Sequence, residues 1–120
     1  MLEKLNIVFE HGLVNICAGM KGREADAILR AKADEVGITQ FLVSPSAGRI
    51  GPHGTGMDPE EHFPVIGSDS DDILEENQTF AYELSAIDVN LTGVRTEDPI
   101  VVRKNGMEPL TNFPRISFKD

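Results

Sequence analysis

The sequence has a single cysteine, Cys17, so it cannot form an internal disulfide bond. It has no tryptophan and only one tyrosine. No apolar run approaches the length that spans a bilayer, and the first residues lack the basic and apolar segments of a signal peptide. These absences predict a cytoplasmic protein in a reducing compartment.

Basic residues are also scarce, since 11 Lys and Arg stand against 20 Asp and Glu and the net charge is -9. A chain with this charge is repelled by nucleic-acid phosphates and by anionic membranes. No basic patch with interleaved aromatic residues offsets the repulsion. We therefore predict that neither a nucleic acid nor a membrane is a partner of this protein.

The remaining composition is ordinary for a globular protein, with 40% hydrophobic and 26% charged residues in 120 positions. This length suits a single domain, which we place at residues 1–120. Apolar residues recur at helical spacing over residues 2–17 and again over 23–36, where Gly37 provides a stop. A strand pattern follows at residues 80–87. Helices first and strands later predict an α+β fold with an antiparallel sheet.

The segments between these elements differ in character. Residues 38–43 fit either a strand or a packed connection. Residues 44–64 are rich in Gly, Pro, Ser and His, and loops of this length often carry function. Residues 67–76 are acidic and predict a solvated surface segment.

The stretch from residue 91 to residue 111 predicts a β-hairpin. Asn105-Gly106 fits a two-residue turn in which both central positions need positive φ. The β-branched run 100–102 precedes this turn, and Glu97 lies just upstream of the run. A carboxylate there can point into a site, and a solvated charge beside the hairpin is the alternative.

Three residues could carry chemistry together. His53 lies in a glycine-rich loop whose backbone can pass close to an ion or substrate, although a structural histidine is the alternative. Glu83 lies inside an apolar strand, where it needs a cation, a partner or solvent. With Glu97 they would supply one imidazole and two carboxylates, which suit Mn, Fe, Co or Zn. No short-range spacing motif links the three, so they would have to meet in the fold.

Five stretches of the chain carry a further pattern. They are residues 18–27, 50–58, 80–83, 93–98 and 110–115. The second has a Gly-His-Gly-x-Gly loop with Pro52 inserted before the histidine, and the fourth reads Gly-Val-Arg-x-Glu-Asp. In this order they resemble the C-terminal half of the pita-bread metallopeptidases, the family of Xaa-Pro dipeptidase, methionine aminopeptidase and creatinase. The resemblance covers nearly the whole chain, and it implies half of a pita-bread fold, with two N-terminal helices packed on a curved antiparallel sheet.

The resemblance also implies a dinuclear site for a divalent metal such as Mn, Co, Zn or Fe. His53, Glu83 and Glu97 inherit the roles of metal ligands, and Glu97 would bridge the two ions. Two such ions can activate a water and stabilise a tetrahedral intermediate. His62 is the nearest match to a second family histidine that contacts the substrate. Its spacing departs from the family pattern, and a surface histidine is the alternative.

The family takes two further Asp ligands from its N-terminal half, and no aspartate of this chain matches their positions. The resemblance therefore implies a fragment, a second chain that supplies the missing half, or a homologue that is not an enzyme. We expect the C-terminal half of a metal-dependent Xaa-Pro dipeptidase-like hydrolase that is inactive alone. Its three ligands would hold one metal weakly or hold none. The alternative is a non-catalytic module that binds a peptide or a protein partner.

The expected partners follow from the same implication. A peptide would be the substrate, and the missing half or a second chain would complete the site. Half of a pita-bread fold would also expose a sheet edge and an apolar seam. We therefore predict that the chain self-associates.

Overall fold

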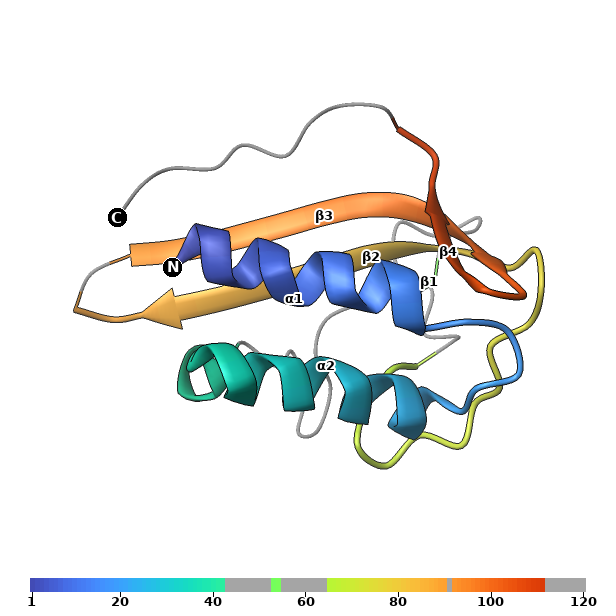
Figure 1. The fold of residues 1–120 in the computed structure, drawn as a ribbon, viewed down its shortest axis with the longest axis horizontal. Helices are drawn as coiled ribbons and strands as arrows, with labels where there is room; N and C mark the ends of the chain where they lie inside the picture. Colours follow the sequence, from blue (N-terminus) through green and yellow to red (C-terminus); the bar gives the residue numbers. More distant parts are fainter. Residues whose placement is uncertain (43–52, 55–64, 91, 112–120) are drawn as a thin grey trace.

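The computed structural model describes residues 1–42, 53–54, 65–90 and 92–111, with two helices covering one face of an antiparallel sheet (Figure 1). The elements in chain order are α1 (Leu2–Asn15), α2 (Gly22–Val36), the short 3-10 helix η1 (Thr39–Phe41), β1 (His53–Gly54), β2 (Thr79–Asp88), β3 (Thr92–Arg103) and β4 (Gly106–Pro109). The strands are neighbours in the order β1-β2-β3-β4, and each pair is antiparallel. The predicted α+β fold is confirmed.

Helix α1 lies directly on the sheet, because its apolar residues fall on one face. Leu5, Val8, Phe9 and Leu13 are buried and follow the 3.6-residue period. The helix contacts β2, β3 and β4, while α2 runs beside it and contacts α1 and η1 (Figure 1). Both predicted helices are therefore confirmed, with α1 ending two residues earlier than expected.

Gly12 allows α1 to approach strand β2 closely. A Cβ at this position would collide with the hydroxyl of Tyr82 and would lie 2.8 Å from Cδ2 of Leu29. The Tyr82 ring is fully buried, stacks on the ring of Phe9 at 4.1 Å between centroids, and donates a hydrogen bond of 3.0 Å to the carbonyl oxygen of Phe9. The absence of a side chain at Gly12 therefore leaves the space that the Tyr82 hydroxyl occupies beside the helix.

The hairpin of β3 and β4 is confirmed, but its predicted turn residues are wrong. Arg103 pairs with Gly106, so Lys104 and Asn105 form the two-residue loop. Among the described residues positive φ occurs only at Gly19, Gly37 and Asn77. Gly106 is needed for a different reason, since a Cβ there would lie 2.8 Å from the carbonyl oxygen of Leu13 at the end of α1. Tertiary packing, rather than turn conformation, selects this glycine.

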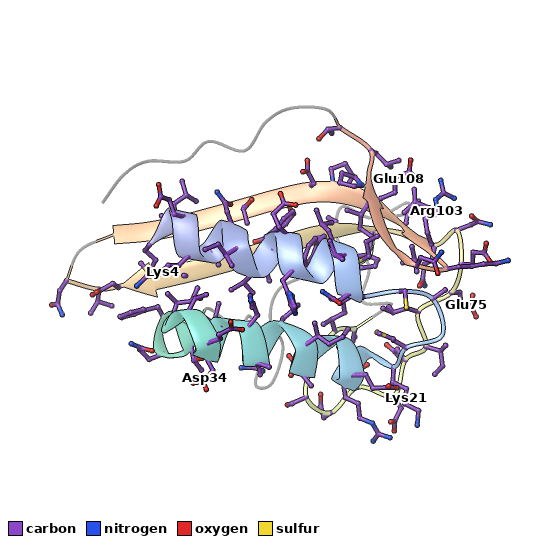
Figure 2. All side chains as sticks on the ribbon, viewed as in Figure 1. Lys4, Lys21, Asp34, Glu75, Arg103 and Glu108 are labelled. Carbon is purple, nitrogen blue, oxygen red and sulfur yellow. The ribbon has the colours of Figure 1, made fainter. Side chains whose placement is uncertain are left out.

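The charged side chains labelled in Figure 2 lie at the periphery of the domain. Near the tip of the hairpin, Nε of Arg103 lies 2.8 Å from Oε2 of Glu108, and its Nη1 lies 2.8 Å from Oδ1 of Asn77. Among the described residues, no helix has the length and apolar character needed to cross a membrane.

Both connecting segments pack against the helices or the sheet. Residues 39–41 form η1, and Leu42 bridges to Ala86 of β2, so the packed connection is correct over the described part of 38–43. The acidic segment 67–76 is not simply solvated, because Leu74 is fully buried and its N–H donates to the carbonyl of Met20 at 2.8 Å. The prediction holds for the side chains of Asp69, Asp71, Glu75 and Glu76, which are exposed, while the backbone of residues 70–74 is hydrogen-bonded to residues 20–23.

Asp26 of α2 is a buried carboxylate. Its side chain is 3% exposed, and Oδ2 lies 2.9 Å from Nε of Arg30. Oδ1 has no hydrogen-bond partner among the described residues. Burial raises the pKa of Asp26 above its ordinary value, the hydrogen bond and charge of Arg30 lower it in part, and the charge of Asp69 adds to the rise.

We expect the raised pKa of Asp26 to make it a source of pH-dependent instability. Above the ordinary aspartate pKa the unfolded chain releases this proton while the folded chain keeps it, so this contribution to stability falls as the pH rises through the folded pKa. Asp26→Asn should therefore gain stability relative to the wild type as the pH rises above the ordinary aspartate pKa of about 4, measured by urea unfolding. The control is Asp34→Asn on the exposed side of α2. A relative loss of stability with rising pH would mean that the ion pair with Arg30 outweighs burial.

Candidate metal centre

Glu83 and Glu97 lie directly opposite each other on β2 and β3. Directly opposite residues of an antiparallel pair point to the same face. The neighbours of Glu83 along β2, Tyr82 and Leu84, are fully buried beneath the helices. The two glutamates therefore share the face of the sheet that points away from α1 and α2. Glu83 is half-buried, with 20% of its side chain exposed, and Glu97 is exposed.

Arg95 lies on the same face of the sheet and contacts Glu83. Arg95 lies two residues before Glu97 on β3, and its Nε is 3.6 Å from Oε1 of Glu83. Like charges placed directly opposite in a sheet are unfavourable, and a nearby cation offsets this cost. The two carboxylates are donors that fit a hard divalent metal ion, whereas Arg95 is not a ligand.

His53 lies on the strand beside Glu83. It pairs with Ala81, which is two residues before Glu83 on β2. The sheet order therefore places the backbones of His53, Glu83 and Glu97 on three adjacent strands. The side chain of His53 and the whole of His62 lie outside the described residues. Within the described part of the chain, no three His, Cys, Asp or Glu side chains are grouped closely enough to hold a metal ion.

Arg95 is the residue that the analysis of the sequence missed. It stands in the Gly-Val-Arg-x-Glu-Asp stretch, and its spacing from Glu97 already put both on one face of a strand. Its contact with Glu83 depends on the pairing of β2 with β3, which the sequence alone does not give. The sequence therefore put Arg95 on the same face as Glu97 but did not identify Glu83 as its partner.

The fold places this chain in the class of pita-bread proteins, because the solved structures that superpose on it have that fold. The X-Pro aminopeptidase of Thermotoga maritima superposes with a TM-score of 0.80 at 28% identity, covering 95% of this chain and 31% of its own. The Xaa-Pro dipeptidase from Bacillus anthracis gives a TM-score of 0.76 at 32% identity, covering 96% of this chain and 32% of its own. The predicted part of a pita-bread fold is thus confirmed.

The family follows from the sequence pattern of metallopeptidase family M24, which matches residues 2–104. The chain belongs to this family, whose metallopeptidases use divalent metals. The Xaa-Pro dipeptidase of Lactobacillus delbrueckii subsp. lactis is 34% identical over 94 residues, which are 78% of this chain and 24% of that protein. The chain therefore spans a third or less of the length of these relatives.

Proposed function

We propose that this chain is the C-terminal part of the catalytic domain of a metal-dependent, Xaa-Pro dipeptidase-like hydrolase that acts on peptides. The observation that carries the proposal is the pairing of Glu83 with Glu97 across two strands, with His53 on the next strand. Membership of family M24 supports it. The single domain over residues 1–120 and the cytoplasmic location remain predictions from the sequence.

The residues of this chain would divide the work at such a site. His53, Glu83 and Glu97 would hold the metal, with Glu97 between two ions, and Mn, Co, Zn and Fe all suit these donors. A bound divalent metal supplies an activated water for attack on a peptide carbonyl. Arg95 lies 3.6 Å from Glu83 and would help to orient that carboxylate. We assign contact with the substrate to His62.

Two further aspartate ligands would come from polypeptide outside this sequence. The relatives are three to four times as long as the region that they share with this chain, so they contain chain that could supply such ligands. With three ligands instead of five, the 120-residue chain should bind metal weakly and should not hydrolyse Xaa-Pro dipeptides by itself. We expect this incomplete site to be completed by the missing part or by a second chain.

Titration with Mn²⁺ in a calorimeter tests the proposal. We expect Glu97→Gln to weaken Mn²⁺ binding by at least about tenfold, because it removes the charge of a proposed ligand. The control is Glu76→Gln, an exposed glutamate away from this face, which should bind as the wild type does. Absence of Mn²⁺ binding by the wild type at millimolar metal, or equal binding by Glu97→Gln, would contradict the proposal. That result would favour a non-catalytic module that binds a peptide or a protein.

A further inference from the structure

The dipeptide Asn105-Gly106 lies at the tip of the hairpin of β3 and β4, and the proposed metal site does not use it (Figure 1). Asn105 is the second residue of the two-residue loop, and Gly106 is the first residue of β4. Both loop residues, Lys104 and Asn105, are exposed. Within the described part of the chain, the side chain of Asn105 has no hydrogen-bond partner. Its carboxamide is therefore free to turn toward the backbone that follows it.

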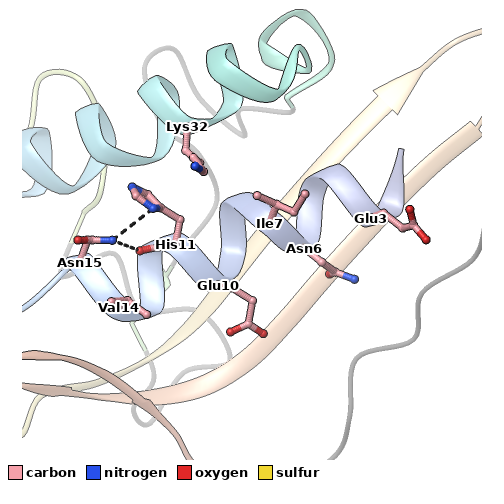
Figure 3. Close-up of a pocket in the computed structure, with 8 residues that line it drawn as sticks. All are labelled: Glu3, Asn6, Ile7, Glu10, His11, Val14, Asn15 and Lys32. Carbon is pink, nitrogen blue, oxygen red and sulfur yellow. Dashed lines mark hydrogen bonds between the residues drawn. The ribbon is translucent and has the colours of Figure 1, made fainter.

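Other exposed asparagines are held by a hydrogen bond or precede a larger residue. The carboxamide of Asn15 donates to a backbone carbonyl one helical turn earlier at 2.9 Å (Figure 3), and Oδ1 of Asn77 accepts a hydrogen bond of 2.8 Å from an arginine. Asn90 is exposed on the turn between β2 and β3, but Leu91 follows it. Of the asparagines in the sequence, Asn105 alone precedes a glycine. The hairpin tip therefore combines a free carboxamide with an unhindered backbone nitrogen.

An asparagine that precedes a glycine can lose its amide as ammonia. The backbone nitrogen of the glycine attacks Cγ of the asparagine, the Cγ–Nδ2 bond breaks, and the proton of the attacking nitrogen ends on the leaving ammonia. Water then opens the resulting cyclic imide at either carbonyl carbon, which gives aspartate or isoaspartate. Glycine favours the ring because it has no side chain beside the nitrogen and adopts many backbone conformations.

The position of Gly106 in the sheet determines how readily its nitrogen can react. Gly106 pairs with Arg103, and this is the last pair of the ladder between β3 and β4. Pairs at the end of an element open more easily than pairs inside it. Lys104 precedes Asn105, and a nearby positive charge favours the anionic form that the nitrogen passes through. Local opening of the tip is therefore sufficient for the attack.

We propose that Asn105 is a modification site, at which the folded chain deamidates spontaneously through a cyclic imide with Gly106 and with water as the co-reactant. In the isoaspartate product the main chain runs through the former side-chain carbon, which lengthens a loop whose two residues fix the hairpin geometry. Gly106 packs so closely on α1 that a Cβ there would lie 2.8 Å from the carbonyl oxygen of Leu13. The isoaspartate product therefore displaces Gly106 and weakens the packing of the hairpin on α1.

Peptide mapping of the folded chain after incubation at mildly alkaline pH tests the site. We expect Asn105 to be converted to aspartate and isoaspartate at least about tenfold faster than the exposed Asn90. The rate should rise with pH, because the attacking nitrogen must lose a proton. A linear peptide of residues 101–110 gives the rate without the fold. Equal rates at Asn105 and Asn90, or an intact Asn105 under conditions that convert the peptide, would overturn the proposal.

Gly12→Ala separates local opening of the tip from unfolding of the whole domain. The added Cβ would collide with the Tyr82 hydroxyl, so this variant is less stable, but the change lies away from the hairpin tip. We expect Asn105 to react within about twofold of the wild-type rate in this variant. A rate that rises in proportion to the unfolded fraction would mean that the folded chain does not react, which contradicts the proposal.

The effect of the product is measured on the isoaspartate form, isolated by ion exchange. Asn105→Asp is the matched control, because it carries the same added charge on an ordinary backbone. We expect freshly prepared Asn105→Asp to melt within a few degrees of the wild type and the isoaspartate form to melt several degrees lower. Equal melting of the two would show that Gly106 is not displaced. Asn105→Gln, which would have to close a larger ring, should remain unmodified, and modification of that variant at the wild-type rate would exclude the cyclic imide.

Discussion

Gly12→Ala is expected to destabilise the domain by about 1–3 kcal/mol in urea unfolding. The added Cβ would collide with the Tyr82 hydroxyl and would lie 2.8 Å from Leu29. Overpacking of this kind costs about 1–3 kcal/mol, and displacement of the Tyr82 hydrogen bond to the carbonyl of Phe9 costs about 1 kcal/mol more. The better helix propensity of alanine returns only about 1 kcal/mol.

A double-mutant cycle identifies the cause of this loss. Tyr82→Phe removes the hydroxyl that the new Cβ would strike, so Gly12→Ala should cost less in the Tyr82→Phe background than in the wild type. The rescue should be partial, because the contact with Leu29 remains. Additive effects of the two substitutions would show that the hydroxyl does not oppose a side chain at residue 12.

Leu84→Glu is expected to unfold the domain, with a loss of several kcal/mol. Leu84 is fully buried on the side of β2 that faces α1, so the substitution places an unpaired carboxylate in the core. The loss is comparable with the whole stability of a domain of this size, and circular dichroism at 25 °C should show loss of structure.

The matched variant is Glu83→Leu, one residue away on the same strand. Glu83 lies on the face of the sheet that points away from α1 and α2, so this change should leave the chain folded, with a melting temperature within a few degrees of the wild type. It should weaken Mn²⁺ binding, because a ligand in the proposed site is lost. If both variants unfold, or if Leu84→Glu folds normally, the assignment of the two faces of β2 is wrong.

The helices and the strand β2 were predictable because local periodicity reports which face is buried. Leu5, Val8 and Phe9 follow the helical period, and Tyr82 and Leu84 alternate with Glu83. The turn of the hairpin was not predictable in the same way. Asn105-Gly106 matches a local preference, but the loop is Lys104-Asn105, and Gly106 packs against the end of α1. A local signal fails where a contact from a distant helix selects the same residue for another reason.

Residues Glu83 and Glu97 were candidates from the sequence because each carboxylate interrupts or adjoins an apolar strand. Arg95 could not be assigned to them, since its partner lies on another strand. The buried role of Asp26 was equally hidden, because a carboxylate in the first turns of a helix ordinarily indicates a favourable helix-dipole interaction. Both features depend on which elements pack together.

The sequence by itself determined the two helices, the long strands, the acidic character and the identity of the candidate ligands, because each of these depends on neighbouring residues. Only the tertiary structure decided that Glu83 faces Glu97, that His53 lies on the adjacent strand, and that one face of α1 remains exposed. The physical reason is that strand register and helix packing depend on contacts between residues far apart in the chain, and a one-residue shift in register would turn either glutamate to the other face of the sheet.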